Sequence, residues 1–225
     1  MPSDKSTTTF DSTEEQRYLE SIQAEIENLS NLCFKLDRSI LPWGEKTASI
    51  LLSLLSYIGG RSDDFLREFR QPSGLGVGLL AYLGRSIFEA HCILCHLLSL
   101  APPDVAQEVI KQIALDKEEL HKNIDDLFPH ELKQKLPAQR ARWSKVKDGT
   151  KRWNMSELVK MDSSLNDLYK KYYPFFNKFA HPTAFSLFCE EDEGAIRAAR
   201  GAYLMMTFRC MIETTTRFAN SLSKS

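Results

Sequence analysis

The chain has 225 residues, 43% of them hydrophobic, and its 29 Lys and Arg against 30 Asp and Glu give a formal net charge of -1. This length suits one large domain that needs no disulfides, and the balanced charge excludes a generally basic surface for nucleic acid or membranes. The five cysteines lie mostly in apolar stretches, and the first residues do not resemble a secretory signal. We therefore expect reduced cysteines and a cytoplasmic location.

The N-terminal part of the chain is expected to be a tail followed by a long helix. Residues 1–11 are polar and rich in Ser and Thr, which predicts a disordered tail. Ser12 and Glu15 form a capping box, and the apolar residues that follow recur at spacings of three and four. This pattern predicts one amphipathic helix.

The next segment is expected to fold as two helices. The run EKTASILLSLLSYIGG is apolar nearly all round, so it predicts a buried helix that is too short to span a membrane. This helix should end at Gly59 and Gly60, because glycine readily adopts the left-handed conformation that ends helices. Ser62 is then expected to cap a separate short helix over SDDFLREF.

The remainder of the chain also shows helical periodicity. Apolar spacing predicts a helix within residues 75–100 and another from about Asp104. Residues 130–154 are charged and are expected to form short helices and a mobile loop. A second capping box at Asn154 predicts the start of a helix in which Pro174 introduces a kink or restart. With a final helix after EEDEG, these elements predict an all-α bundle of roughly six to eight helices over residues 12–222.

The helix within residues 75–100 has an unusual polar face. This face is small and carries few charges, so it is expected to pack inward, with Arg85 and Glu89 as a semi-buried ion pair. The face consists of Gly78, Ala81, Tyr82, Arg85, Glu89, Cys92, His96 and Ser99. Further partners are expected from FFNKFAHPTAF, where Asn177 and His181 share a helix face. His181, at a helix C-terminus, has the chemistry of an acid, a base or an anion contact; the alternative is that these four residues form a structural polar lock.

The sequence CILCH formally matches the C-x-x-C-H motif that attaches c-type haem. It lies within a continuous apolar helix, and no second Cys or His pair is present to complete a zinc site. We interpret CILCH as ordinary helix packing, and we expect neither a cofactor nor a bound metal.

One segment of the chain is strongly basic and carries two tryptophans. Cations neutralise phosphates and tryptophan stacks on bases, so this segment is a candidate RNA contact. Its candidate residues are Arg140, Arg142, Trp143, Lys145, Lys147, Lys151 and Arg152. The alternative is a solvated charged face.

RSIFEA, followed downstream by YKKYYPFFNKFAHPTAF, resembles a group of uncharacterised bacterial helical proteins. More distantly, it resembles the HEPN-like (higher eukaryotes and prokaryotes nucleotide-binding) bundles. HEPN ribonucleases carry an arginine, a polar residue and then a histidine, a spacing that Arg85, Ser86 and His91 match. The resemblance implies RNA cleavage without metal, often across a homodimer. On a regular helix His91 is turned by about 120° from Arg85, so Arg85 and Glu89 with Asn177 and His181 form the better-aligned group.

Two functional hypotheses follow. The first is a HEPN-like protein of the toxin or phage-defence kind that binds or cleaves RNA, with an antitoxin protein or a second copy as further expected partners and no membrane. The second is a non-catalytic interaction or regulatory module in which the Arg-Glu and Asn-His residues only hold the helices together. An open cleft at Arg85 and His181 favours the first hypothesis, and a sealed cluster favours the second.

Overall fold

The computed structural model confirms the all-α multi-helix bundle. It describes residues 12–35, 44–71, 77–127, 151–180 and 193–223. Within these residues there are seven α-helices, one short 3-10 helix and no strand. The predicted tail, residues 1–11, and most of the charged segment 130–154 lie outside the described residues.

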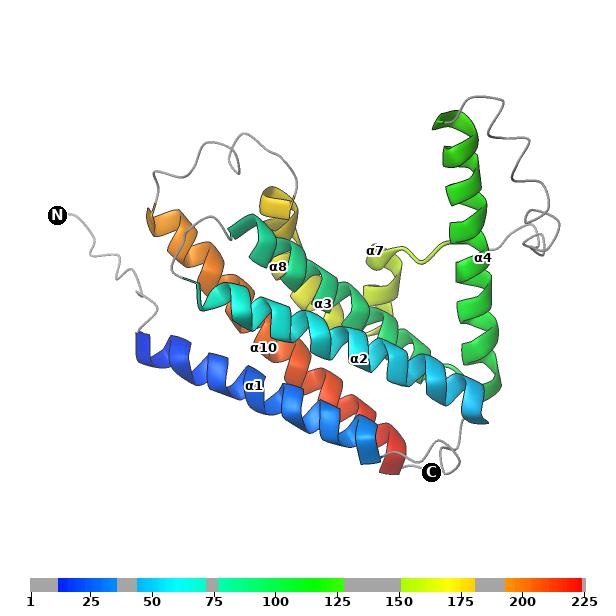
Figure 1. The fold of residues 1–225 in the computed structure, drawn as a ribbon, viewed down its shortest axis with the longest axis horizontal. Helices are drawn as coiled ribbons and strands as arrows, with labels where there is room; N and C mark the ends of the chain where they lie inside the picture. The colour runs from blue at the N-terminus through cyan, green and yellow to red at the C-terminus, as the bar shows by residue number, and fades with distance from the viewer. Residues whose placement is uncertain (1–11, 36–43, 72–76, 128–150, 181–192, 224–225) are drawn as a thin grey trace.

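The helices pack around a central one, α3, which contacts α2, α8 and α10 (Figure 1). The elements are α1 (Ser12–Lys35), α2 (Gly44–Phe69), α3 (Val77–Ser99), α4 (Pro102–Leu127), α7 (Met155–Leu158), η2 (Val159–Met161), α8 (Ser163–Ala180) and α10 (Glu193–Ser223). Helix α1 packs against α2 and α10, whereas α4 stands away from the bundle. The start of α4 is tied to α2 by Thr47, whose hydroxyl donates to the carbonyl of Pro102 at 3.1 Å.

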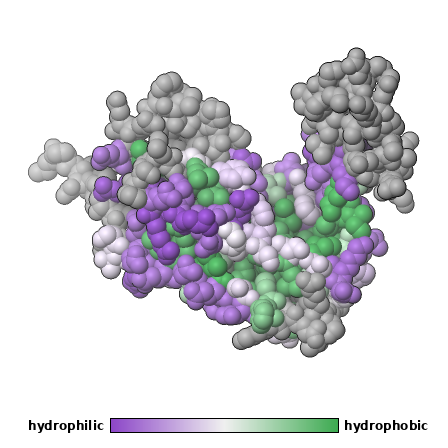
Figure 2. Space-filling view, viewed as in Figure 1, coloured by the Kyte–Doolittle hydropathy of each residue, from purple (hydrophilic) through white to green (hydrophobic). Residues whose placement is uncertain are grey.

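Burial distinguishes α3 from α4. Helix α3 is long and apolar enough to cross a membrane by length and composition, but most of it is buried against its neighbours, as in the core helix of a soluble protein. Its side chains include Leu80, Ile87 and Leu94, which are fully buried. Helix α4 instead presents Ile110 and Ile113 about half exposed. Figure 2 shows apolar surface on the side of the molecule where α4 lies. The core therefore lies around α3.

Helix α2 is continuous where the sequence predicted two helices. It runs through Gly59 and Gly60 to Phe69, although each helical glycine costs about 1 kcal/mol relative to alanine. Ser62 is not an N-cap: it is fully buried, and its hydroxyl bonds to the Ile58 carbonyl and to the Met211 sulfur, each at 2.9 Å. Packing against α10 therefore overrides the local stop signal.

Helix α8 begins later than the sequence predicted. Asn154 does cap a helix, because its Oδ1 accepts from the Ser156 backbone N–H at 2.9 Å, but that helix is the single turn of α7. Asp162 caps α8 instead, with its Oδ1 accepting from the backbone N–H groups of Ser164 at 2.9 Å and Leu165 at 3.4 Å. From there α8 continues through Pro174 without interruption.

The cap at Asp162 gives a testable prediction. Asp162→Ala should lower the free energy of unfolding by about 1 kcal/mol from the cap alone, and more from the loss of the Arg217 guanidinium 2.6 Å away. Asp162→Asn keeps the capping oxygen, so it should lose only the ion pair. Urea denaturation of both variants measures the difference; equal losses would contradict a capping role.

Both variants lack the Asp162 carboxyl group, so both should also differ from wild type in acid. Partial burial opposes ionisation of Asp162, but bonds from Ser164 and Arg217 outweigh it and lower the pKa to about 2. The ion pair therefore contributes above about pH 4, the ordinary range for a carboxyl group, and is lost as the pH falls through 2. Asp162→Ala and Asp162→Asn should each remove this acid dependence.

Candidate functional site

Arg85 and Glu89 lie one turn apart on α3 and form the predicted ion pair. The Arg85 Nε donates to Glu89 Oε1 at 2.8 Å. Tyr173 of α8, which the sequence analysis did not select, donates its hydroxyl to the same oxygen at 2.9 Å. The Arg85 guanidinium also lies 5.4 Å from the centre of the Tyr173 ring. A signal was present, because Tyr173 precedes the candidate Asn177 by one helical turn.

At neutral pH Arg85 provides a positive charge beside the Tyr173 hydroxyl, which can donate a hydrogen bond. Partial burial lowers the pKa of Arg85, but Glu89 and Tyr173 outweigh that effect and raise it. Burial and the nearby Glu89 carboxylate raise the pKa of Tyr173 to about 12. At neutral pH Arg85 is therefore charged and Tyr173 retains its proton.

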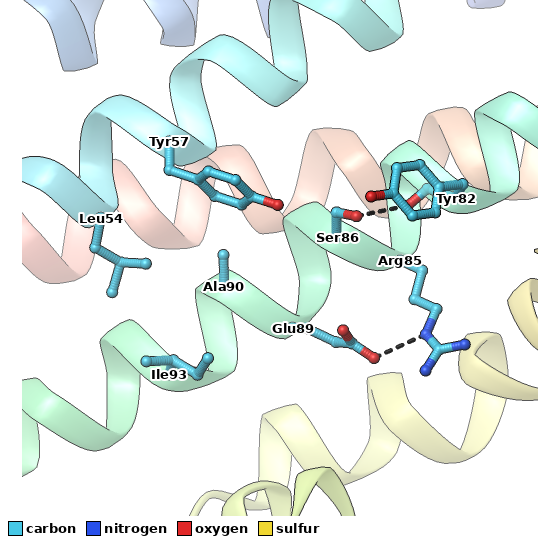
Figure 3. Close-up of a pocket in the computed structure, with 8 residues that line it drawn as sticks. All are labelled: Leu54, Tyr57, Tyr82, Arg85, Ser86, Glu89, Ala90 and Ile93. Carbon is cyan, nitrogen blue, oxygen red and sulfur yellow. Dashed lines mark hydrogen bonds and ion pairs between the residues drawn. The ribbon is translucent and has the colours of Figure 1, made fainter. Parts of the chain in front are cut away.

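Arg85 and Glu89 line a pocket between α2 and α3 (Figure 3). The pocket has a volume of about 590 Å³ and is lined by Leu54, Tyr57, Tyr82, Arg85, Ser86, Glu89, Ala90 and Ile93. The side chains of Arg85 and Glu89 remain 27% and 30% exposed. This volume and the mixed apolar and polar lining are typical of small-ligand sites. The ion pair is therefore at a pocket wall and not sealed in the core.

The geometry of this pocket is the basis for assigning a function. Comparisons with protein-family models, curated proteins and solved structures found no match. The HEPN-like resemblance consequently depends on the short sequence motifs alone.

Of the two residues expected opposite Arg85, the structure describes Asn177 but not His181. Asn177 is half-buried on α8, and its Oδ1 has no hydrogen-bond partner among the described residues. The preceding residue, Phe176, is fully buried against Gly84 of α3, so α3 and α8 approach closely at this level. His181 lies outside the described residues.

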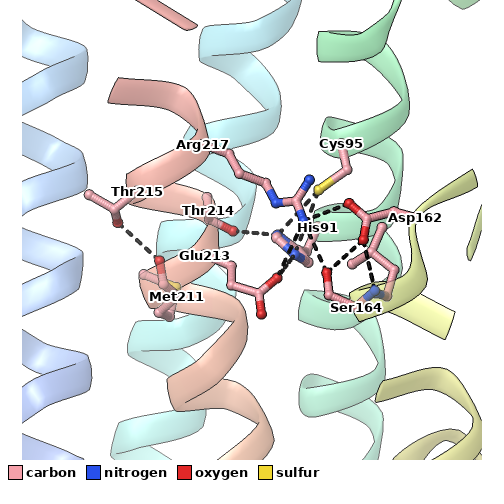
Figure 4. A network of polar contacts seen from close by, with 10 residues as sticks. His91, Cys95, Asp162, Ser164, Met211, Glu213, Thr214, Thr215 and Arg217 are labelled. Atoms are coloured by element: carbon pink, nitrogen blue, oxygen red, sulfur yellow. Dashed lines mark hydrogen bonds and ion pairs between the residues drawn. The ribbon is translucent and has the colours of Figure 1, made fainter. Parts of the chain in front are cut away.

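His91 lies away from the pocket. It is fully buried at the contact between α3 and α10 (Figure 4), with Nδ1 2.8 Å from the Thr214 hydroxyl. Its Nε2 lies 3.5 Å from Glu213 Oε2 and 3.7 Å from the Cys95 sulfur. At 3.5 Å the Glu213 contact is an ion pair, not a short hydrogen bond. The structure does not bring Arg85 and His91 together, as the rotation between them on a helix predicts.

A polar network extends from His91 to the start of α8. Glu213 Oε2 lies 3.8 Å from Arg217, which in turn contacts Asp162 and the Ser164 hydroxyl. Burial lowers the pKa of His91, but its contacts with Cys95 and Glu213 outweigh this effect and raise it to about 9. Because Glu213 and Arg217 are spaced i, i+4 on α10, sequence periodicity alone could have identified this pair.

The residues of CILCH pack within the bundle, as we interpreted them. Cys92 and Cys95 are buried free thiols. The His96 ring lies edge-on to Trp153, with 6.1 Å between the ring centres. Within the ranges that the structure describes, no cluster of three or more Cys, His, Asp or Glu side chains is arranged to hold a metal ion.

Two of the seven candidate RNA contacts in the basic segment are described. Lys151 and Arg152 are both exposed, but Arg152 pairs with Asp116 at 3.3 Å and with Glu119 of α4. Its charge is therefore largely neutralised. The other five lie outside the described residues, namely Arg140, Arg142, Trp143, Lys145 and Lys147.

Proposed function

We propose that this chain binds RNA in the pocket between α2 and α3, with Arg85 contacting a backbone phosphate. The observation that supports this proposal is a partly exposed guanidinium, held in place by Glu89 and Tyr173, at the wall of a pocket of about 590 Å³. Phosphate contacts supply most of the affinity of nucleic-acid binding, and the planar donors of arginine suit phosphate oxygens.

The carboxylate in the same pocket favours RNA over DNA. An ionised carboxylate only accepts hydrogen bonds, and the ribose 2′-hydroxyl is the donor that distinguishes RNA from DNA. Glu89 lines the pocket beside Arg85, so in this proposal its carboxylate accepts from the 2′-hydroxyl while Arg85 contacts the phosphate. The HEPN-like resemblance of RSIFEA and FFNKFAHPTAF also supports RNA.

The proposal extends to metal-independent cleavage of the bound RNA, as in a toxin or phage-defence factor. In that reaction a base takes the proton of the 2′-hydroxyl, whose oxygen attacks the adjacent phosphorus while the 5′-oxygen leaves and is protonated. Arg85 would stabilise the charge on the phosphate. The fully buried His91 has no access to it, so His181 is the histidine proposed for proton transfer.

The experiment measures binding and degradation of labelled single-stranded RNA by the full chain. Because Arg85→Ala leaves the Glu89 carboxylate without its ion-pair partner, an Arg85→Gln, Glu89→Gln double variant provides a neutral, hydrogen-bonded replacement. Binding by this variant should weaken at least about tenfold, and the slope of log affinity against log salt should fall by about 0.7.

The controls separate cleavage from binding. Arg67→Ala removes an arginine that lies on α2, is 67% exposed and does not line the pocket. This substitution should leave binding unchanged. His181→Ala should retain binding and abolish degradation. Undiminished RNA binding by a folded Arg85→Gln, Glu89→Gln variant would contradict the proposal.

A second candidate function is a non-catalytic interaction module. The observation that favours it is that the polar groups also join helices: Tyr173 links α8 to Glu89, and His91 links α3 to Glu213 and Thr214 of α10. In this case wild-type protein binds no RNA, and the double variant changes only stability.

A further inference from the structure

The pocket carries two exposed tyrosines in addition to Arg85. Tyr57 of α2 and Tyr82 of α3 are 43% and 50% exposed. We propose that the pocket takes a single unpaired nucleotide of the RNA, with its base stacked on these tyrosines and its phosphates held by Arg61 and Arg85. This inference rests on the proposed RNA binding and specifies the substrate as single-stranded.

The two tyrosines are arranged around one small residue. Figure 3 shows the rings of Tyr57 and Tyr82 directed towards each other across Ser86. The Ser86 hydroxyl donates to the Tyr82 backbone carbonyl at 2.9 Å, so its oxygen is available as an acceptor for a base or ribose N–H or O–H. Aromatic rings on a polar surface are the usual platforms for unpaired bases, because every base has a flat face.

A second guanidinium lies beside these tyrosines. Arg61 follows Tyr57 by one turn of α2, and its guanidinium is 5.2 Å from the centre of the Tyr57 ring. The hydroxyl of Tyr57 and the carboxylate of Asp64 raise the pKa of Arg61. Asp64 lies 3.6 Å away at an exposed position, where such a pair contributes little. Arg61 is therefore a cation next to the aromatic platform.

The rest of the lining suits a nucleoside. Leu54, Ala90 and Ile93 provide aliphatic surface, while Glu89 supplies a carboxylate acceptor. A base is flat and largely apolar on its faces, whereas its ribose and phosphate are polar. The combination of aromatic, aliphatic, acceptor and cationic groups in one pocket therefore matches one nucleotide.

Base pairing is incompatible with this mode of binding. A base within a duplex is stacked on both faces and paired at its edge, so it enters a pocket only after it unstacks and unpairs, at a cost of a few kcal/mol. We therefore expect single-stranded RNA to bind better than the same sequence in a duplex. An aromatic or acidic peptide would use some of the same groups, but a single nucleotide uses all of them.

The test uses fluorescence anisotropy with the full chain and a short labelled single-stranded RNA, its duplex, and a strand with abasic sites. Tyr57→Ala and Tyr82→Ala should each weaken binding at least about fivefold, the loss expected from one base-stacking contact. Tyr57→Phe and Tyr82→Phe should bind nearly as well as wild type. Arg61→Ala should reduce the salt slope, expected at about -1.4 for two phosphate contacts.

Two substitutions serve as matched controls, because both remove exposed groups that neither line the pocket nor, as Arg61 does, lie against the Tyr57 ring. Arg67→Ala controls for Arg61, since both arginines lie on α2 and contact Asp64. Phe34→Ala removes an aromatic side chain that is 92% exposed on α1. Neither should change the affinity.

The outcomes separate this inference from the proposed function. If the RNA binds through Arg85 but the abasic strand, the duplex and the tyrosine-to-alanine variants bind as tightly, the single-nucleotide inference is wrong and RNA binding stands. If wild type binds no RNA, both proposals are wrong. Binding of an aromatic or acidic peptide in place of RNA, lost in Tyr57→Ala and Tyr82→Ala, would overturn both and assign the pocket to protein recognition.

Discussion

Gly84→Ala is expected to lower the free energy of unfolding by about 1–2 kcal/mol, although alanine is ordinarily the better helix former by about 1 kcal/mol. A Cβ at Gly84 would lie 2.8 Å from Cε1 and 3.3 Å from Cζ of Phe176. The Phe176 ring has little freedom to move, because it is fully buried and stacked on Tyr203 with 5.1 Å between ring centres. Gly84→Val should cost about 3 kcal/mol.

Gly60 supplies the matched control. A Cβ there meets nothing within 4 Å, so Gly60→Ala should stabilise the protein by about 0.5–1 kcal/mol. Denaturant unfolding of Gly84→Ala and Gly60→Ala measures the two changes in the free energy of unfolding. The same measurement is made on a double variant that combines Gly84→Ala with Phe176→Leu. The double variant should recover part of the loss, because the smaller side chain makes room. A stabilising Gly84→Ala would show that α3 and α8 are not in tight contact here.

The free energy of unfolding should fall between about pH 6.5 and pH 9 because of His91. Burial opposes the charge of His91, but Cys95 and Glu213 outweigh it and raise its pKa to about 9 in the folded chain, against about 6.5 when unfolded. A histidine with a raised pKa stabilises fully below the unfolded value, and this contribution is lost as the pH rises through the folded value. The difference between the folded and unfolded pKa values of His91 corresponds to up to about 3 kcal/mol of stability.

Variants identify the source of this pH dependence. Glu213→Gln removes the carboxylate that lies 3.5 Å from His91, so it should destabilise at neutral pH by about 1.5–3 kcal/mol and flatten the decline. Cys95→Ala removes the other contact that raises the pKa of His91, so it should also make the decline smaller. Burial raises the pKa values of Cys92 and Cys210, so these thiols do not titrate in the same range. Urea unfolding at a series of pH values measures all three proteins, and an unchanged slope in Glu213→Gln would contradict the ion pair.

The features that sequence analysis predicted correctly are local. Ser12 begins α1, Asn154 caps a helix, and Arg85 and Glu89 pair on α3 because residues four apart face the same side of a helix. The same rotation argument separated His91 from Arg85. Each of these depends only on helix geometry, which the spacing of residues determines.

The errors in the fold arose where packing overrides local signals. Gly59 and Gly60 are helix-ending residues by propensity, but burial of Ser62 and its neighbours on α2 against α10 keeps the helix continuous. Asn154 begins only one turn, because Leu158 and Val159 are buried and α8 has its own cap at Asp162. These outcomes depend on contacts between segments that are distant in the sequence.

The sequence by itself determined that this protein is an all-α bundle with an Arg85–Glu89 pair on its central helix, because periodicity and i, i+4 spacing specify which residues share a face. Only the tertiary structure decided what surrounds that pair. It places Tyr173 against Glu89, opens a pocket towards Tyr57 of α2, and buries His91 against α10. The physical reason is that side chains from separate helices become neighbours only through packing, which no local pattern encodes.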